Sequence, residues 1–123
     1  MSAHAEAGGE LAMKLITAIV RPDKLDELIG ALVDNRAHGL TVTEVRGFGR
    51  QFGQLAAGAG LSRVILLHKI RLDVVALDDD VEILVEAIAK HARTETIGDG
   101  KIWVTPVDGA LRVRTGDRDR AAI

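Results

Sequence analysis

Residues 39–51 read GLTVTEVRGFGRQ, an alternating segment that runs directly into a glycine-rich one. Across 40–46 the residues alternate, with Leu40 and Val42 on one side and Thr41 and Thr43 on the other, which is the pattern of a strand with two distinct faces. The glycines and alanines that follow, over 47–61, favour a long exposed loop. Loops of this length are uncommon in compact domains and are usually functional or disordered.

The rest of the chain adds three strands and two helices to this one. Residues rich in β-branched side chains predict strands over 14–20, 69–76 and 101–107. Two segments repeat apolar residues at helical spacing: one opens at Pro22, and the other follows Asp78–Asp80, which we expect to cap it. The resulting order β-α-β-β-α-β predicts an α+β, ferredoxin-like fold, with an antiparallel sheet and both helices on one face. The open face of that sheet favours burial against other subunits.

Bulk properties narrow the class of protein. The chain has 123 residues, 47% hydrophobic and 28% charged, with a formal net charge of -2 and no cysteine. This composition suits one compact domain over 13–123, preceded by a disordered tail over 1–12. The basic residues are not clustered as they are in nucleic-acid-binding proteins, and without cysteine no thiolate chemistry is possible. No apolar run is long enough to span a membrane. We therefore expect a cytoplasmic protein that is not itself a membrane protein.

Three short segments could hold an anion: 47–51, 94–101 and 112–116. Glycines in the first two allow backbone N–H groups to approach a ligand closely, and Arg50 or Lys101 could supply charge. Arg112 and Arg114 are predicted to lie on one face of an extended segment and to bind phosphate oxygens together. Taken singly, each segment is more often an ordinary turn or a solvated basic edge than an anion site.

Taken together and in this order, the three segments resemble the P-II signal-transduction family. The most specific stretches are residues 39–51, then IGDGKI over 97–102, then RVRTG over 112–116. The resemblance implies a homotrimer that binds an adenine nucleotide (ATP, ADP or AMP) in each cleft between subunits. It also implies a regulator of a partner protein, a transporter or metabolic enzyme, and not an enzyme itself.

The resemblance also implies site residues. Those expected around the adenine and ribose are Ile19, Gly39, Leu40, Thr41, Asp73 and Val75, where the family usually has Glu in place of Asp73. Those expected at the phosphates are Gly49, Arg50, Gly98, Asp99, Gly100 and Lys101, with Arg112 and Arg114 from the neighbouring subunit. Thr94 and Ile97 match the loop that closes the cleft, while Glu95 and Thr96 replace the usual Gly and Lys. Gln51 matches a residue that helps hold magnesium with ATP, and Lys69 one that faces a 2-oxoglutarate carboxylate.

The long loop departs from the family pattern. The family's loop (the T-loop) carries a Tyr that is uridylylated, whereas this chain has no Tyr, so that modification is excluded. The loop looks like that of a divergent branch linked to inorganic-carbon uptake and carboxysomes, which responds to adenine nucleotides and bicarbonate. We therefore expect a mobile element over 51–68, and a small anion at its base that is bicarbonate in preference to 2-oxoglutarate.

Other interpretations stay open at this stage. The chain could be a typical nitrogen-regulatory P-II protein sensing ATP, ADP and 2-oxoglutarate, or a structural trimer that senses no nucleotide. An enzyme on the same fold is disfavoured because no nucleophile or acid/base pair emerges. The four histidines lack metal-ligand spacing, and Trp103 is interpreted as a strand core or interface residue.

Overall fold

The computed structural model describes residues 12–48 and 65–123. Its elements are β1 (Met13–Val20), α2 (Leu25–Asp34), β2 (Thr41–Gly47), β3 (Leu67–Leu77), α4 (Val81–Ala92) and β4 (Lys101–Val107). Short 3₁₀ turns lie before each helix, η1 (Pro22–Lys24) and η2 (Asp78–Asp80), and near the end of the chain, η3 (Asp119–Ala122). This order confirms the predicted β-α-β-β-α-β sequence of elements. The predicted tail over 1–12 falls almost wholly outside the described residues.

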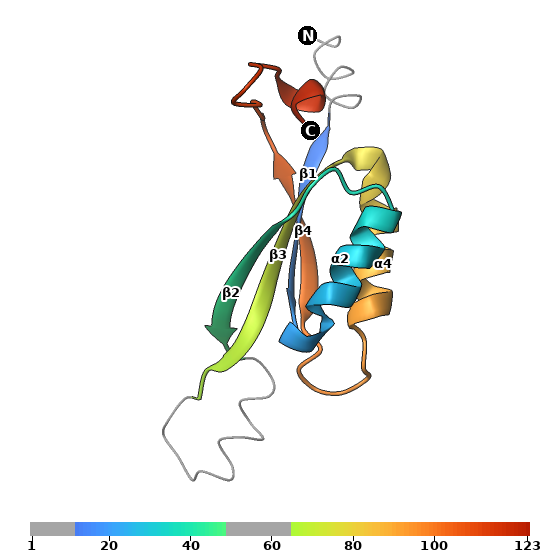
Figure 1. Ribbon diagram of the computed structural model, residues 1–123, viewed down its shortest axis with the longest axis vertical. Helices are drawn as coiled ribbons and strands as arrows, with labels where there is room; N and C mark the ends of the chain where they lie inside the picture. The colour runs from blue at the N-terminus through green and yellow to red at the C-terminus, as the bar shows by residue number, and fades with distance from the viewer. Residues whose placement is uncertain (1–11, 49–64) are drawn as a thin grey trace.

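The four strands form one antiparallel sheet in the order β2-β3-β1-β4, and both helices cover the same face of it (Figure 1). The two central strands pair along their length, from Met13 opposite Leu77 to Val20 opposite Ile70. The ferredoxin-like α+β fold is therefore confirmed. Among the described residues, no helix is long and apolar enough to cross a membrane.

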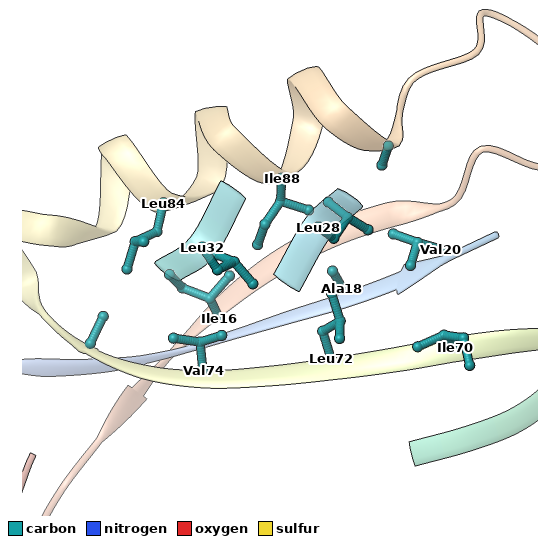
Figure 2. Packing of buried hydrophobic residues seen from close by; sticks show 12 residues of the cluster. Ile16, Ala18, Val20, Leu28, Leu32, Ile70, Leu72, Val74, Leu84 and Ile88 are labelled. Carbon is teal, nitrogen blue, oxygen red and sulfur yellow. The ribbon is translucent and has the colours of Figure 1, made fainter. Parts of the chain in front are cut away.

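Side-chain alternation on the central strands divides the sheet into two chemically different faces. On β3 the even-numbered residues from Ile70 to Ala76 are buried, and they pack with Ile16, Leu28 and Ile88 under the helices (Figure 2). The odd-numbered residues of the same strand point to the opposite face, because successive side chains of a strand alternate. That uncovered face carries polar and charged groups, and it is where the candidate site lies.

Several predicted boundaries are wrong by one to two residues. Leu67 and His68 belong to β3, so they are not part of the predicted mobile element, and Gly47 ends β2 instead of opening the loop. The other loop residues, 49–64, lie outside the described residues. Asp78–Asp80 also differ from expectation: they form the 3₁₀ turn η2, and none makes a side-chain cap hydrogen bond to α4. Asp78 instead pairs with Lys14, at 3.4 Å.

The helix–sheet core gives a direct stability prediction. Ile88 of α4 is fully buried against the sheet, whereas Ile83 on the same helix is 54% exposed. We expect Ile88→Ala to lower the free energy of unfolding by about 2–5 kcal/mol, through lost burial and a residual cavity. The matched change Ile83→Ala should cost less than about 0.5 kcal/mol. Urea unfolding at one fixed protein concentration measures both, and equal losses would contradict this assignment of the core.

Candidate functional site

A cavity of about 740 Å³ lies on the uncovered face of the sheet, at the end where β2 finishes and β4 begins. The strands supply its floor, and residues 96–100, which connect α4 to β4, supply one wall. The lining residues are Ile19, Val45, Arg46, Gly47, Phe48, Lys69, Arg71, Thr96, Ile97, Gly98, Asp99, Gly100, Lys101 and Trp103. Positive charge from Arg46, Lys69, Arg71 and Lys101 exceeds the single carboxylate of Asp99, so the cavity suits an anionic ligand.

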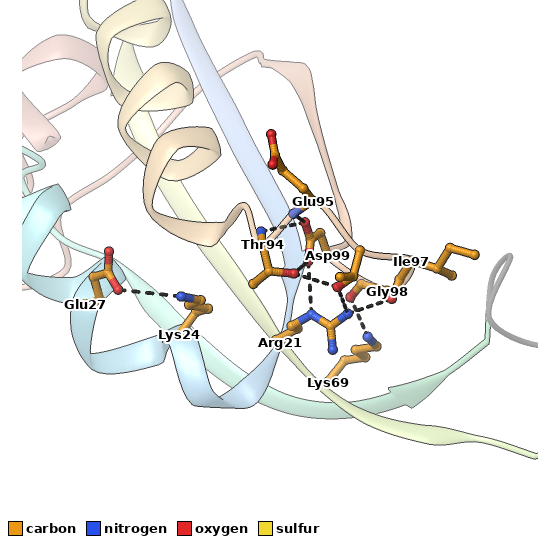
Figure 3. A network of polar contacts seen from close by, with 10 residues as sticks. Arg21, Lys24, Glu27, Lys69, Thr94, Glu95, Ile97, Gly98 and Asp99 are labelled. Atoms are coloured by element: carbon orange, nitrogen blue, oxygen red, sulfur yellow. Dashed lines mark hydrogen bonds and ion pairs between the residues drawn. The ribbon is translucent and has the colours of Figure 1, made fainter.

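The connecting loop 94–100 is organised around the Asp99 carboxylate (Figure 3). That carboxylate accepts hydrogen bonds from the backbone N–H groups of Thr94 (2.6 Å) and Glu95 (2.8 Å) and from the Thr94 hydroxyl. Arg21 Nε reaches the same carboxylate at 3.0 Å from the end of β1. Hydrogen bonds from Thr94, Arg21 and Glu95 together hold the pKa of Asp99 far below its ordinary value.

Lys69 ties the same loop to the sheet from inside the cavity. Its ammonium Nζ donates to the Gly98 carbonyl at 2.7 Å, and only 9% of the residue is exposed. Burial lowers the pKa of Lys69, the nearby charge of Arg21 lowers it further, and Asp99 partly offsets both. A buried ammonium with one neutral acceptor is a favourable partner for an incoming anion, because charge-assisted hydrogen bonds are stronger than neutral ones.

Glycine is required where the loop meets β1. Gly100 has φ +101°, and a Cβ at that position would lie 1.7 Å from the Ile19 carbonyl oxygen. The close approach brings the loop backbone directly against the strand. Gly98, with φ +102°, also adopts a conformation that other residues rarely take. The two glycines of the IGDGK segment therefore shape the cavity wall.

The loop leaves donors available to a ligand. Among the described residues, the backbone N–H groups of Ile97, Gly98 and Gly100 have no hydrogen-bond acceptor. Each of these residues lines the cavity. Successive N–H groups in a glycine-containing turn beside a lysine form a concavity that suits phosphate or carboxylate oxygens.

The structure brings about half of the predicted site residues together. Ile19, Lys69, Ile97, Gly98, Asp99, Gly100 and Lys101 all line the one cavity, and Thr94 contacts it through Asp99. Gly39, Leu40, Thr41, Asp73 and Val75, expected around the adenine and ribose, do not line it. Gly49, Arg50 and Gln51 lie outside the described residues, so their predicted phosphate and magnesium roles stay predictions. Within the described ranges, no group of three acidic or histidine side chains could hold a metal.

Asp73 nevertheless belongs to a polar cluster beside the cavity. It lies opposite Thr41 in the sheet, and its carboxylate accepts from the buried Thr17 hydroxyl (2.8 Å) and from Arg71 Nε (2.9 Å). Burial raises the pKa of Asp73, but the hydrogen bonds from Arg71 and Thr17 outweigh it and leave the pKa below its usual value. The ionised carboxylate thereby orients Arg71, which does line the cavity.

The prediction for Arg112 and Arg114 is wrong in its local geometry. They were expected on one face of an extended segment, whereas residues 112–116 form a turn closed by the Gly116 N–H bonding the Arg112 carbonyl at 2.8 Å. A bridge between Leu111 and Arg118 supports this turn. The turn lies beyond the far end of β4, at the opposite end of the sheet from loop 94–100 (Figure 1). Within one chain the two arginines therefore cannot share a ligand with Lys101.

Sequence reasoning missed several residues of this site, among them Arg71, Trp103 and Arg21. Arg71 stands between Lys69 and Asp73 at a spacing of two, and that alternation would have placed all three on one face of the strand. Trp103 is 41% exposed and lines the cavity, so within one chain it is not a core residue. Arg21 precedes Pro22 and carries no pattern of its own. Only the fold brings it to loop 94–100, 75 to 78 residues away in sequence.

Comparison with known proteins gives one consistent family. Residues 13–117 match the family model described as nitrogen regulatory protein P-II. Relatives include nitrogen regulatory protein P-II 2 of Methanothermobacter thermautotrophicus, 47% identical over 90% of this chain and 97% of that protein. Nitrogen regulatory protein P-II of Cereibacter sphaeroides is 48% identical over 90% of this chain and all of that one. A crystal structure of Arabidopsis thaliana PII bound to citrate superimposes with a TM-score of 0.76 at 36% identity, covering 91% of this chain and 92% of that one.

The close approach at Gly100 predicts a severe effect of a single methyl group. Gly100→Ala should displace the loop or the strand, because its Cβ would overlap the Ile19 carbonyl. We expect a loss of at least about 3 kcal/mol in the free energy of unfolding, or failure to fold. Gly116→Ala is the control: it shares a positive φ (+77°) but meets open space, so only the backbone cost of about 1 kcal/mol applies. Similar losses in the two variants, measured by thermal or urea unfolding, would contradict the close approach.

The Asp99 carboxylate predicts a pH dependence of stability. Its pKa is depressed in the folded state, so the unfolded state binds the proton more readily. The stabilisation is therefore complete above the unfolded value, about pH 4, and is lost as the pH falls below it. We expect Asp99→Asn to unfold more easily at pH 7 and to show a shallower loss of stability between pH 5 and pH 2.5. Asp79→Asn, at an exposed carboxylate, should keep the slope of the parent, and a slope in Asp99→Asn as steep as the parent's would refute the assignment.

Proposed function

Because the chain belongs to the nitrogen regulatory protein P-II family, we propose that it is a regulator that binds an adenine nucleotide and controls a partner protein, without catalysing a reaction itself. The observation that carries the proposal is the cavity wall: Ile97, Gly98 and Gly100, whose N–H groups have no acceptor among the described residues, line a positively charged cavity together with Lys101. This donor arrangement fits the oxygens of a phosphate chain.

The nucleotide lies between copies of the chain. Arg112 and Arg114 are exposed at the end of the sheet opposite Lys101, so they reach a shared phosphate only from a neighbouring copy. The uncovered face of the sheet, with Trp103 and Val45 among its apolar groups, provides the surface for that neighbour. A closed ring is the ordinary outcome of a contact between two different surfaces of one chain, and a homotrimer is the proposed assembly.

We assign the remaining predicted residues to the binding of the adenine and ribose. Gly39 and Leu40 directly precede β2, while Thr41, opposite Asp73, and Val75 lie along the sheet beyond Arg71. A ligand that spans from loop 97–101 to these residues has to extend across the uncovered face. That direction is consistent with a nucleotide whose phosphates occupy the cavity while its base lies against the neighbouring copy.

A small anionic effector would bind at Lys69. The ammonium is buried, lines the cavity and has only the Gly98 carbonyl as acceptor in the described part of the chain. The related plant protein bound to citrate shows that one member of this fold takes a carboxylate anion. Bicarbonate and 2-oxoglutarate are the two candidates. Titrating each into nucleotide-loaded protein separates the carbon-linked interpretation from the typical nitrogen-regulatory one.

If the site is composite, two variants that each bind ATP weakly should recover tight binding when they are mixed. Lys101→Ala and Arg112→Ala should each weaken ATP binding by about 1.5–3 kcal/mol, the loss expected for a hydrogen bond between charged groups. If Lys101 and Arg112 come from different copies, co-refolded mixtures contain interfaces in which both residues are intact. Isothermal titration calorimetry should then recover a fraction of tight sites that neither variant shows alone.

The control for charge is Lys90→Ala, an exposed lysine on the helical side, which should bind ATP as the parent does. Mixtures that stay as weak as the separate variants would contradict a site built from two copies. Absence of binding heat and of thermal stabilisation with ATP, ADP and AMP at millimolar concentration would overturn the proposed function, and a structural trimer would become the better interpretation.

A further inference from the structure

Arg21 holds the cavity-forming loop without lining the cavity itself. It follows β1 directly, and its guanidinium makes three contacts with loop 94–100 (Figure 3). Nε donates to the Asp99 carboxylate at 3.0 Å, while Nη2 donates to the Thr96 hydroxyl at 2.8 Å and to the Ile97 carbonyl at 2.6 Å. Arg21 is absent from the cavity lining, so it makes these contacts without bordering the cavity.

The loop is held mainly by the bonds to the Asp99 side chain, and only weakly by bonds between its own backbone groups. Its internal backbone hydrogen bonding, among the described residues, is a single 3.3 Å contact from the Asp99 N–H to the Thr96 carbonyl. Glu95 adopts φ +65°, a left-handed conformation that costs about 1 kcal/mol for a residue with a side chain. The strained Glu95 is kept in place because its N–H bonds to Asp99, and Asp99 is in turn fixed by Arg21.

Arg21 and Lys69 lie side by side against the loop (Figure 3) and have different access to a ligand. Lys69 lines the cavity and bonds the Gly98 carbonyl, so an anion in the cavity competes for its ammonium. Arg21 bonds the neighbouring Ile97 carbonyl from outside the lining, so its contacts persist when a ligand arrives. Of the two cations, Arg21 is the one that can preserve the loop's shape during binding.

We propose that Arg21 is a positioning residue for anion binding: it fixes loop 94–100 before the ligand arrives, so that Ile97, Gly98 and Gly100 already stand in place along the cavity wall. The proposal deepens the proposed function and rests on it for the identity of the ligand. Preorganising a binding loop increases affinity because the cost of ordering it is met on folding. A planar guanidinium can reach the carboxylate, the hydroxyl and the carbonyl together, whereas an ammonium cannot.

The test uses Arg21→Lys, which keeps the charge but removes the planar fork. The matched control is Arg93→Lys, the same substitution at an exposed residue next to the loop, whose side chain makes no hydrogen bond or ion pair within the described ranges. Thr96→Val is a second variant, which removes the hydroxyl that contacts both Arg21 and the Thr94 hydroxyl and leaves Arg21 in place. It keeps the proposal testable if Arg21→Lys folds poorly.

The first measurement needs no ligand. Amide hydrogen exchange of Thr94, Glu95 and Asp99 should become about tenfold faster in Arg21→Lys, and faster to a smaller extent in Thr96→Val, because these amides exchange through local opening of the loop. Amides of β1 and β3 should exchange as in the parent, which a general loss of stability would not produce. Unchanged exchange at the three loop amides in both variants overturns the proposal.

The second measurement is calorimetry with ATP and with inorganic pyrophosphate. Arg21→Lys should bind both about five- to tenfold more weakly, by a similar factor, since the effect is on the loop and not on the base. Arg93→Lys should bind as the parent does. Faster loop exchange with unchanged affinity overturns Arg21 as a positioning residue for binding. A parent protein that binds neither probe overturns the proposed function and the binding half of this proposal, while the exchange result still decides whether Arg21 holds the loop.

Discussion

The Asp99 carboxylate is the contact on which the cavity depends. It gathers two backbone N–H groups, a hydroxyl and a guanidinium onto one side chain, and so it joins the end of α4 to the end of β1. Its bond from the Glu95 N–H offsets part of the cost of the left-handed conformation of that residue. Asp99 thus holds the cavity wall together by accepting bonds within its own loop. The lysines that line the cavity then remain as partners for an anion.

The two faces of the sheet have different roles, one in the core and one in the site, and this explains how a small domain supports such a site. Ile16, Leu28 and Ile88 belong to the apolar core that packs the helices onto one face of the sheet. The opposite face is then free to carry Lys69, Arg71 and Asp73 at successive outward positions of β3. Polar residues on a central strand would ordinarily be costly, but here each one bonds a neighbour or borders the cavity.

The sequence was sufficient to predict the fold and the glycine segment that forms one wall of the cavity, but not the contacts that hold this wall. Alternation and helical spacing depend on neighbouring residues, so all four strands and both helices could be found, with errors of one or two residues at Gly47 and Leu67. The IGDGK segment is local as well, and its glycines act through their own φ angles. Arg21 and the turn that carries Arg112 could not be predicted in this way. Their geometry follows from contacts between distant segments, or from hydrogen bonds such as that from Gly116 to Arg112, for which the residue pattern gives no signal.

Trp103 gives this cavity a built-in optical reporter. It is the only tryptophan in a chain without tyrosine, so light absorbed at the red edge of the protein band excites that one indole. The indole stands partly in solvent at the border of the cavity. Its emission wavelength and its quenching by dissolved iodide therefore report the solvent exposure of this one position. A molecule that fills the cavity, or a copy of the chain that packs on this face of the sheet, changes that exposure. The change can be followed without attaching a label.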